Sequence, residues 1–342
     1  MEDVQAATWR RWSQTRWMQQ GDAPSRFFFT LLKTKRAREA ITLLDTQDGR
    51  RLETKDDIMS ELHRFYTNLY KRDPAIEAAA SMRKDVLSGI TRKVNSTQNA
   101  KLSAIPMVEE VGNTVRSLKN DKAPGADGMT SEVIKVIRTE EQHDVMDFIL
   151  TFWRTGTLCW KQLVGVIKLI PKKGDKARIK NWRSLQILNT GYKLLSKLLA
   201  NRLSEVMDSV VNTDQKGFIK GRNIDDNVLN YLIGQEWAEI SKQPSIFVKL
   251  DFEKAYDRGS VSKIHVNGQF SEEIQIEREI KQGCPIAPLL FAITTQPLMT
   301  ILRHRQAEGK LRGLKLCGQT TMLHNLFADD TGVMYKQTLR NL

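Results

Sequence analysis

The chain has 342 residues, of which 40% are hydrophobic and 27% charged, so a globular protein with a hydrophobic core is expected and a disordered one excluded. Lysine and arginine number 53 against 40 aspartates and glutamates, a net charge of +13. This excess predicts a polyanionic partner, nucleic acid before an anionic membrane, although a basic protein without such a partner stays an alternative.

The three cysteines are scattered, form no zinc-binding pair and give no disulfide framework, which favours a reducing compartment. No apolar run is long enough to span a membrane, and the first residues lack the profile of a signal peptide. We therefore expect an intracellular protein, nuclear or cytoplasmic and not secreted. No glycine-lysine phosphate loop is present, which excludes a P-loop ATPase.

Residues 1–100 are predicted to form a basic, mainly helical extension. Near its start, tryptophans are interleaved with arginines, a pattern that suits stacking on nucleic acid or an amphipathic helix that buries its indoles: Trp9, Arg10, Arg11, Trp12, Arg16 and Trp17. A strand at Ile41–Leu44, a tight turn at Asp48-Gly49 and a helix over residues 56–70 follow. The polar stretch from Arg92 to Ala100 is predicted to be a linker.

The middle of the chain alternates helices with loops rich in glycine, proline and basic residues. The expected helices cover residues 108–118, 131–137, then up to 153, and 192–211. Residues 119–128 and 216–222 are expected to be loops, and residues 164–170 a strand.

Two acidic positions follow or interrupt apolar strands near the end of the chain. Asp251 ends Ile246-Phe247-Val248-Lys249-Leu250, and Asp329-Asp330 follows Leu326-Phe327-Ala328. Between them, Asn267-Gly268 predicts a hairpin with flanking strands at 264–266 and 273–276, and residues 289–302 predict one helix.

These acids can hold a metal. Two like charges about 4 Å apart repel by roughly 4 kcal/mol at an effective dielectric of about 20, and a divalent cation relieves that repulsion. Three carboxylates on strand ends are what two-metal phosphoryl transfer requires. Taken alone, an Asp-Asp pair such as Asp329-Asp330 is most often a solvated turn.

Seven blocks in order give the chain a resemblance to the reverse transcriptases of LINE-type (non-LTR) retrotransposons, and a weaker one to group II intron enzymes. The resemblance covers about residues 17–335. The blocks are Trp17–Asp22 with Phe27–Phe29, Lys122–Gly128, Leu169–Gly174 with Asn181–Arg183, Gln215–Phe218 with Gly221–Arg222, Leu250–Asp257, Lys281–Pro285 with Pro288–Phe291, and Phe327–Asp330.

The resemblance implies an α+β, helix-rich fold of the right-hand polymerase kind, with fingers, a palm built on a small antiparallel sheet, and no thumb. It implies three regions: the extension at 1–100, fingers and the start of the palm at 101–245, and an incomplete palm at 246–342. The implied function is an RNA-directed DNA polymerase that uses Mg²⁺ or Mn²⁺. The implied partners are an RNA template, a DNA primer and deoxynucleoside triphosphates, without a membrane; protein partners stay open.

The same resemblance assigns residue roles by position. Asp251, Asp329 and Asp330 match the catalytic, metal-binding aspartates. Lys172, Arg183, Tyr256, Gln282 and Gly283 match nucleotide-binding residues: the first two clasp the triphosphate, Tyr256 lies beneath the sugar, and Gln282-Gly283 forms a turn beside the nascent base pair. Lys216 and Arg222 match the basic loop expected at nucleic acid, with Arg222 in a mainly structural role; plain packing stays an alternative for Tyr256 and Gln282.

The sequence also departs from the family pattern. Nine residues separate Asp257 from Asn267, where the family has a long helical segment, and the chain ends twelve residues after Asp330. A misplacement of about 1 Å can lower a rate roughly 100-fold, so missing palm and thumb segments can leave the site inactive. The alternatives are a catalytically dead remnant that binds RNA or DNA through its basic residues, and a chain that does not fold.

Overall fold

The computed structural model describes most of the chain between residues 40 and 336. The described residues are 40–46, 48–72, 80–140, 142–242, 244–251, 260–277, 283–315, 321–322, 324–327 and 330–336. They divide into two compact units: unit 1 contains Met1–Lys71, Ile105–Leu198 and Tyr256–Cys284, and unit 2 contains Arg72–Ala104, Leu199–Ala255 and Pro285–Leu342. Within the described ranges, every helix is too short or too polar to cross a membrane.

A five-stranded sheet with the order β4-β3-β6-β7, in which β8 also pairs with β6, forms the centre of unit 1. Its strands are β3 (Val164–Pro171), β4 (Trp182–Ile187), β6 (Ser260–Val266), β7 (Gln269–Phe270) and β8 (Ile274–Ile276). β3 and β6 are parallel and the other pairs antiparallel. β3 is central, which fits its nearly continuous apolar sequence, because such strands are covered on both faces. The predicted strand at 164–170 is confirmed.

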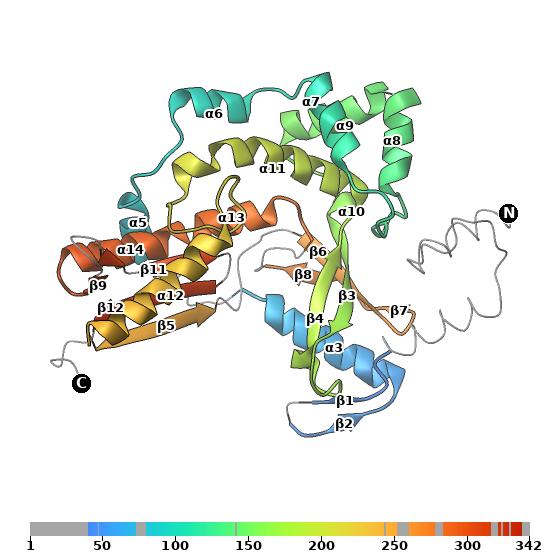
Figure 1. Cartoon of the computed structure of the whole chain (residues 1–342). Helices are drawn as coiled ribbons and strands as arrows, with labels where there is room; N and C mark the ends of the chain where they lie inside the picture. Colours follow the sequence, from blue (N-terminus) through green and yellow to red (C-terminus); the bar gives the residue numbers. More distant parts are fainter. Residues whose placement is uncertain are drawn as a thin grey trace, which may run out of the picture. The chain divides into compact units, whose positions relative to one another are not determined.

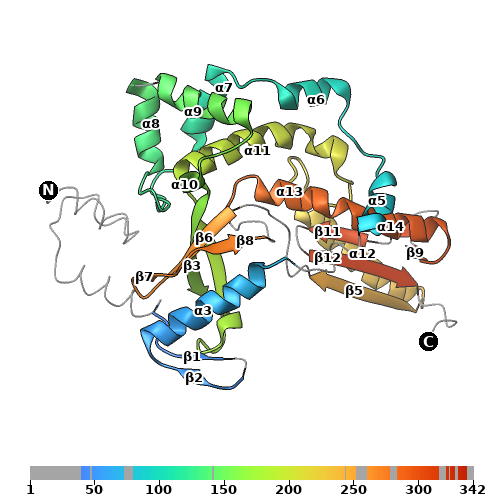
Figure 2. The same cartoon turned by 180° about the vertical axis from the view of Figure 1, so that it is seen from behind.

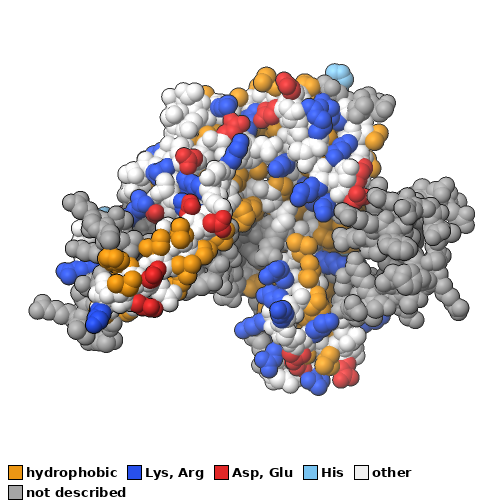
Figure 3. Space-filling view, in the orientation of Figure 1, with side chains coloured by type: hydrophobic (Ala, Val, Ile, Leu, Met, Phe, Trp, Pro, Cys, Tyr) orange, Lys and Arg blue, Asp and Glu red, His pale blue; other side chains and the backbone are white. Residues whose placement is uncertain are grey.

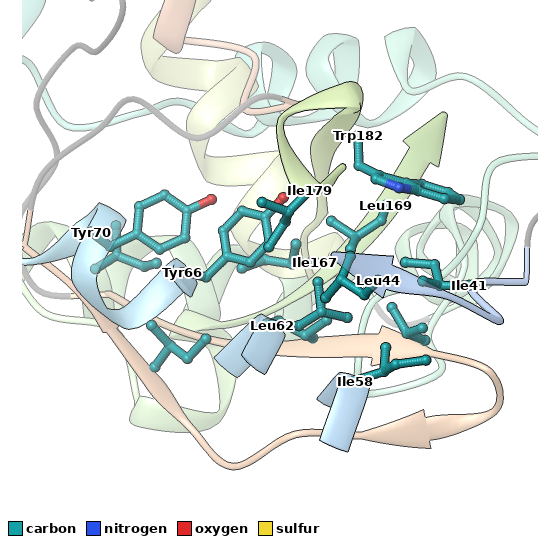
Figure 4. Close-up of a cluster of buried hydrophobic side chains, with 14 residues drawn as sticks. Ile41, Leu44, Ile58, Leu62, Tyr66, Tyr70, Ile167, Leu169, Ile179 and Trp182 are labelled. Atoms are coloured by element: carbon teal, nitrogen blue, oxygen red, sulfur yellow. The ribbon is translucent and has the colours of Figure 1, made fainter. Parts of the chain in front are cut away.

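Helix α3 (Lys55–Tyr70) covers part of this sheet and contacts β6 and β8 (Figures 1 and 2). Its buried residues recur at helical spacing and are at most 2% exposed: Ile58, Leu62, Tyr66 and Tyr70. They pack with Ile167 and Ile264 of the sheet in one apolar cluster (Figure 4). Thr54 caps the helix by accepting the backbone N–H of Asp57. The helix predicted over residues 56–70 is confirmed.

Two hairpins in unit 1 form at the predicted turns. Strands β1 (Leu44–Asp45) and β2 (Arg51–Leu52) pair across Asp48-Gly49. At Asn267-Gly268 both residues have positive φ, 52° and 84°, as a type I′ turn requires. The Asn267 side chain also donates to the carbonyl of Ile41 at 2.7 Å and accepts its N–H at 3.1 Å. One turn residue thus joins segments 226 positions apart.

The helices of unit 1 are α7 (Val108–Ser117), α8 (Ser131–Glu140), α9 (Gln142–Thr155) and α10 (Trp160–Leu163), together with the first part of α11 (Thr190–Val210), which ends in unit 2. The 3-10 turn Ile179–Asn181 lies between β3 and β4. The helices predicted at 108–118 and 192–211 are confirmed within a residue or two. The helix predicted at 131–137 extends to Glu140.

Unit 2 holds a three-stranded antiparallel sheet with the order β11-β12-β5. Its strands are β5 (Ser245–Asp251), β11 (His324–Phe327) and β12 (Asp330–Lys336), and a separate pair joins β9 (Leu314–Lys315) to β10 (Thr321–Met322). Helix α12 (Ile224–Ile240) covers one face, in front of the sheet in Figure 1 and behind it in Figure 2. The remaining helices are α5 (Ala80–Ser88), α6 (Ser96–Ser103), α13 (Ala287–Thr294) and α14 (Gln296–Ala307).

The linker predicted from Arg92 to Ala100 is wrong, because helix α6 begins at Ser96. Asn95 accepts the N–H of Gln98 at 2.8 Å, and Gln98 accepts the N–H of Asn95 at 2.9 Å, which is a reciprocal capping box. Gln98 also donates to Ser209, and Lys101 pairs with Glu205 at 2.8 Å. The segment is held by polar contacts with α11, so no apolar period reveals it.

The single helix predicted over residues 289–302 is also wrong, because the chain forms α13 and α14 with a break at Thr295. Pro297 lies in the first turn of α14, where its missing N–H leaves no hydrogen bond unmade. Helix-rich content with mixed and antiparallel sheets agrees with the predicted α+β class.

Candidate active site

The two acidic strand ends meet in unit 2. Asp251 is the last residue of β5, Asp330 is the first of β12, and the two are direct partners in the antiparallel ladder. Directly opposed residues share one face of a sheet, with Cβ atoms about 4.5–5.5 Å apart. Asp330 is also the partner of Phe327 on β11, and Asp329 lies outside the described residues. Acids 79 positions apart (330 − 251) therefore share one sheet end.

The register of β5 and β12 is fixed by residues beyond the acids. Seven consecutive pairs join the strands, from Asp330 with Asp251 to Lys336 with Ser245. Val333, which is paired with Val248, is 6% exposed. A slip of one residue would move Val333 to the opposite face of the sheet, so its burial helps to keep the two acids opposite each other.

Like charges directly opposite each other destabilise a sheet, so this end of the β5–β12 pair is suited to a cation. Carboxylate oxygens are the ligands that Mg²⁺ and Mn²⁺ prefer. Among the described residues, no cluster of three or more histidines, cysteines or acids could hold a metal. The donor chemistry of Asp251 and Asp330 nevertheless fits a divalent cation, with Asp329 as the third carboxylate in sequence.

Gly283 lies in unit 1 at a position that only glycine fits. Its φ is +113°, and a Cβ there would lie 2.7 Å from the carbonyl oxygen of Gln186. The turn thus contacts the backbone of β4, and a side chain would collide with it. The resemblance places Gly283 in a turn beside the nascent base pair. In the structure, its close packing against β4 is by itself a sufficient reason for a glycine here. Gln282 and Tyr256 lie outside the described residues.

Lys172 and Arg183 lie together at the turn end of the β3–β4 hairpin, beside the segment that joins the two strands. Ile170 pairs with Arg183, and the backbone N–H of Lys172 donates to the carbonyl of Asn181 at 2.7 Å. The segment Pro171–Arg183 has six lysines and arginines and one aspartate, so its net charge is 6 − 1 = +5. Figure 3 shows many basic side chains in the region where β3, β4 and α3 lie. This hairpin is a concentrated positive surface that suits a polyphosphate.

The basic loop at residues 215–222 is held tightly in unit 2. The Arg222 side chain is 8% exposed and donates to Asp208 at 2.6 Å and to the carbonyls of Val211 and Gln215 at 3.1 and 2.8 Å. Hydrogen bonding and charge attraction from Arg222 lower the pKa of Asp208. Lys216 pairs with Asp226 at 3.0 Å. Through these contacts, the Arg222 guanidinium caps the carboxyl end of α11 and holds the loop in place.

One residue that the sequence reasoning missed is Asn189, which is fully buried between β4 and α11. Its amide donates to the carbonyl of Lys161 at 2.7 Å and accepts the N–H of Asp127 at 3.3 Å. A Cβ on Gly125 would lie 2.1 Å from its Oδ1. Asn189 thus holds the Lys122–Gly128 loop next to the segment that joins β4 to α11. Its signal in the sequence is weak, an asparagine immediately before a helix.

Lys193, one turn into α11, contacts the same loop and donates to the carbonyl of Ala123 at 3.3 Å. Burial lowers the pKa of Lys193, and the nearby Asp127 opposes this effect. Thr190 donates to the carbonyl of Met129 at 2.6 Å. The loop is therefore fixed by the first turn of α11 as well as by Asn189.

Comparison with known proteins identifies the family of the chain. Residues 170–341, half of the chain, match the family model described as reverse transcriptase (RNA-dependent DNA polymerase). The chain is 28% identical over 312 residues to the transposon TX1 uncharacterized 149 kDa protein of Xenopus laevis, an alignment that covers 83% of this chain and 24% of that protein.

Two further relatives are also proteins of transposable elements. The Pol polyprotein from type-1 retrotransposable element R2 of Popillia japonica is 26% identical, covering 59% of this chain and 31% of that protein. The probable RNA-directed DNA polymerase from transposon BS of Drosophila melanogaster is 21% identical, in an alignment that covers 68% of this chain and 28% of that protein. The chain thus spans a quarter to a third of these relatives, and they confirm the resemblance to non-LTR reverse transcriptases. The chain belongs to the reverse transcriptase (RNA-dependent DNA polymerase) family.

Proposed function

We propose that this chain acts as the RNA-directed DNA polymerase domain of a non-LTR retroelement. It extends a DNA primer along an RNA template with deoxynucleoside triphosphates. The observation that supports this best is the register of Asp330 with Asp251 at one end of an antiparallel sheet, in a chain of the reverse transcriptase family. The free cysteines Cys159 and Cys284 suit a reducing compartment, the nucleus or the cytoplasm.

Asp251, Asp329 and Asp330 are the proposed ligands of two Mg²⁺ or Mn²⁺ ions. When bound, such ions lower the pKa of the primer 3′-hydroxyl and stabilise the pyrophosphate that leaves. The contribution of the protein is to hold carboxylates on two paired strands whose register is fixed by seven residue pairs. A rigid ladder suits this task because the reacting oxygens must be positioned within a fraction of an ångström.

Lys172 and Arg183 are proposed to bind the triphosphate of the incoming nucleotide, supported by their common place in the segment Pro171–Arg183, whose net charge is +5 (6 − 1). An arginine can bind two phosphate oxygens at once, whereas a lysine acts as a point charge. Tyr256 is proposed to lie beneath the sugar, and Gln282-Gly283 beside the new base pair. Lys216 and Arg222 belong to the proposed template region, with Arg222 acting through the loop that it organises.

Primer extension on an RNA template tests this proposal. The wild-type chain is expected to add deoxynucleotides in Mg²⁺ or Mn²⁺, and Asp251→Asn or Asp330→Asn is expected to lower the rate at least 100-fold. Asp85→Asn, an exposed carboxylate of α5 in the same unit, is the matched control and should leave the rate unchanged. No incorporation by the wild-type chain in either metal would refute catalysis by this chain.

A second candidate is a binder of RNA or DNA without catalysis, which the concentrated charge of the β3–β4 hairpin favours. It predicts binding that weakens steeply with salt and is unchanged in Asp251→Asn. Replacing Lys172 and Arg183 by glutamine should lower the slope of log K against log salt by roughly 0.7 for each lost contact to a single strand. Binding with no extension activity would favour this candidate over the polymerase.

A further inference from the structure

Helix α12 in unit 2 buries small and polar residues and exposes its large apolar ones. The residues that it buries are Asn227, Gly234 and Ala238, a polar residue and two of the smallest. A helix that packs by small residues approaches its neighbour closely but buries little apolar surface there. Most of the apolar surface of α12 must therefore lie elsewhere.

That surface is exposed. Six large apolar side chains of α12 are between 39% and 67% exposed: Ile224, Val228, Leu229, Leu232, Ile233 and Ile240. Val228 and Leu232 lie one turn apart, as do Leu229 and Ile233, so the four form a continuous patch. Figure 3 shows apolar side chains, interrupted by acids, along the position of α12. Continuous exposed apolar patches mark interaction sites.

The charges on α12 select among possible occupants of this patch. The helix carries Asp225, Asp226, Glu236 and Glu239 and has no lysine or arginine. Asp226 is paired with Lys216, which leaves three acids among the exposed apolar residues. In a chain of net charge +13, this is a local negative surface, so it repels nucleic acid and anionic lipid. A second copy that used the same face would bring acids against acids.

The size of the patch further limits the kind of partner that can bind it. A helix of 17 residues is about 25 Å long, so one face buries well under the roughly 800 Å² per partner that a stable dimer uses. The patch has the size to hold one helix packed alongside α12, which would contact it through residues at helical spacing. We propose that the outer face of α12 binds a basic amphipathic helix of a partner protein, with the apolar side of that helix on Val228, Leu229, Leu232 and Ile233 and its lysines or arginines on Asp225, Glu236 and Glu239.

Synthetic helices of 18 residues test the proposal on the full chain. The probe is a fluorescent amphipathic leucine–lysine peptide, and the comparison peptides are its leucine–glutamate counterpart and a scrambled leucine–lysine sequence. The leucine–lysine helix is expected to bind at least tenfold more tightly than either. The chain as a whole repels a cationic peptide, so binding reports on a local acidic site. Replacing Asp225, Glu236 and Glu239 by their amides should weaken the leucine–lysine helix and strengthen the leucine–glutamate helix.

The apolar contribution is tested by a double variant, Leu229→Gln with Leu232→Gln, which should weaken binding at least tenfold. Ile105→Gln with Val136→Gln is the matched control, since these residues are 67% and 60% exposed outside α12. Circular dichroism melts should be unchanged in both double variants because the side chains are exposed. Equal binding of all three peptides, or undiminished binding by the α12 variant, overturns the proposal. If the wild-type chain sediments as a dimer and the α12 variant as a monomer, the proposal is overturned, and the patch binds a second copy of the chain.

Discussion

Asp330 lies directly opposite Asp251 in the antiparallel ladder of β12 and β5. Residues at such a register share one face of the sheet, so the two carboxylates are proposed to repel each other without a cation and to bind one together when it is present. The proposed metal site and the stability of unit 2 are therefore expected to be linked.

We first predict that metal and stability are coupled through this pair. Without divalent metal, Asp251→Asn is expected to raise the free energy of unfolding by about 0.5–1 kcal/mol, because the repulsion between opposed charges is removed. Mg²⁺ should stabilise the wild-type chain and have less effect on the variant. Urea unfolding in EDTA and in Mg²⁺ measures both effects, with Asp85→Asn as the control. Equal stabilisation of all three proteins by Mg²⁺ would argue against a metal at this pair.

Gly283→Ala is expected to destabilise unit 1 more than Gly268→Ala does. Both glycines have positive φ, +113° and +84°, but a Cβ meets the carbonyl oxygen of Gln186 at 2.7 Å only at Gly283, whereas Gly268 has open space. The conformational strain is about 1–2 kcal/mol at both sites, and the collision should add about 1–3 kcal/mol at Gly283. Thermal or urea unfolding of the two variants compares them, and similar losses would mean that the turn can move away from β4.

Asn189→Ala is expected to loosen the Lys122–Gly128 loop. The substitution leaves the N–H of Asp127 and the carbonyl of Lys161 without their partner, at a cost of about 1–3 kcal/mol for each group that stays buried. Hydrogen exchange at Asp127 and limited proteolysis of the loop should both rise. Asn99→Ala, at an exposed position of α6, is the control. Unchanged protection at Asp127 would show that Thr190 and Lys193 hold the loop by themselves.

The ion pair of Arg222 and Asp208 predicts a dependence of stability on pH. Arg222 lowers the pKa of Asp208 in the folded chain. A lowered folded-state pKa contributes stability above the ordinary aspartate pKa, and this contribution is lost as the pH falls through the folded-state value. The difference in unfolding free energy between the wild-type chain and Asp208→Asn should therefore shrink as the pH falls below about 4. A difference that stays constant down to acid pH would contradict this linkage.

Parts of the fold could be predicted from the sequence because they depend on neighbours in the chain. The hairpin at Asn267-Gly268 follows from two residues that accept positive φ, and α3 follows from apolar residues at helical spacing. The α6 helix and the break before α14 were missed for equally local reasons. A polar helix held by a capping box has no apolar period, and a proline in a first turn does not disturb one.

The sequence by itself determined the family, because several short blocks in order identify a reverse transcriptase even where each block alone is weak. It also determined which acids are candidates for a metal. Only the tertiary structure decided that Asp330 is the partner of Asp251, that Gly283 contacts Gln186, that Asn189 holds a distant loop, and that α12 turns its large apolar residues outward. The physical reason is that strand register, close backbone approach and burial arise between segments far apart in the chain, where no local pattern specifies them.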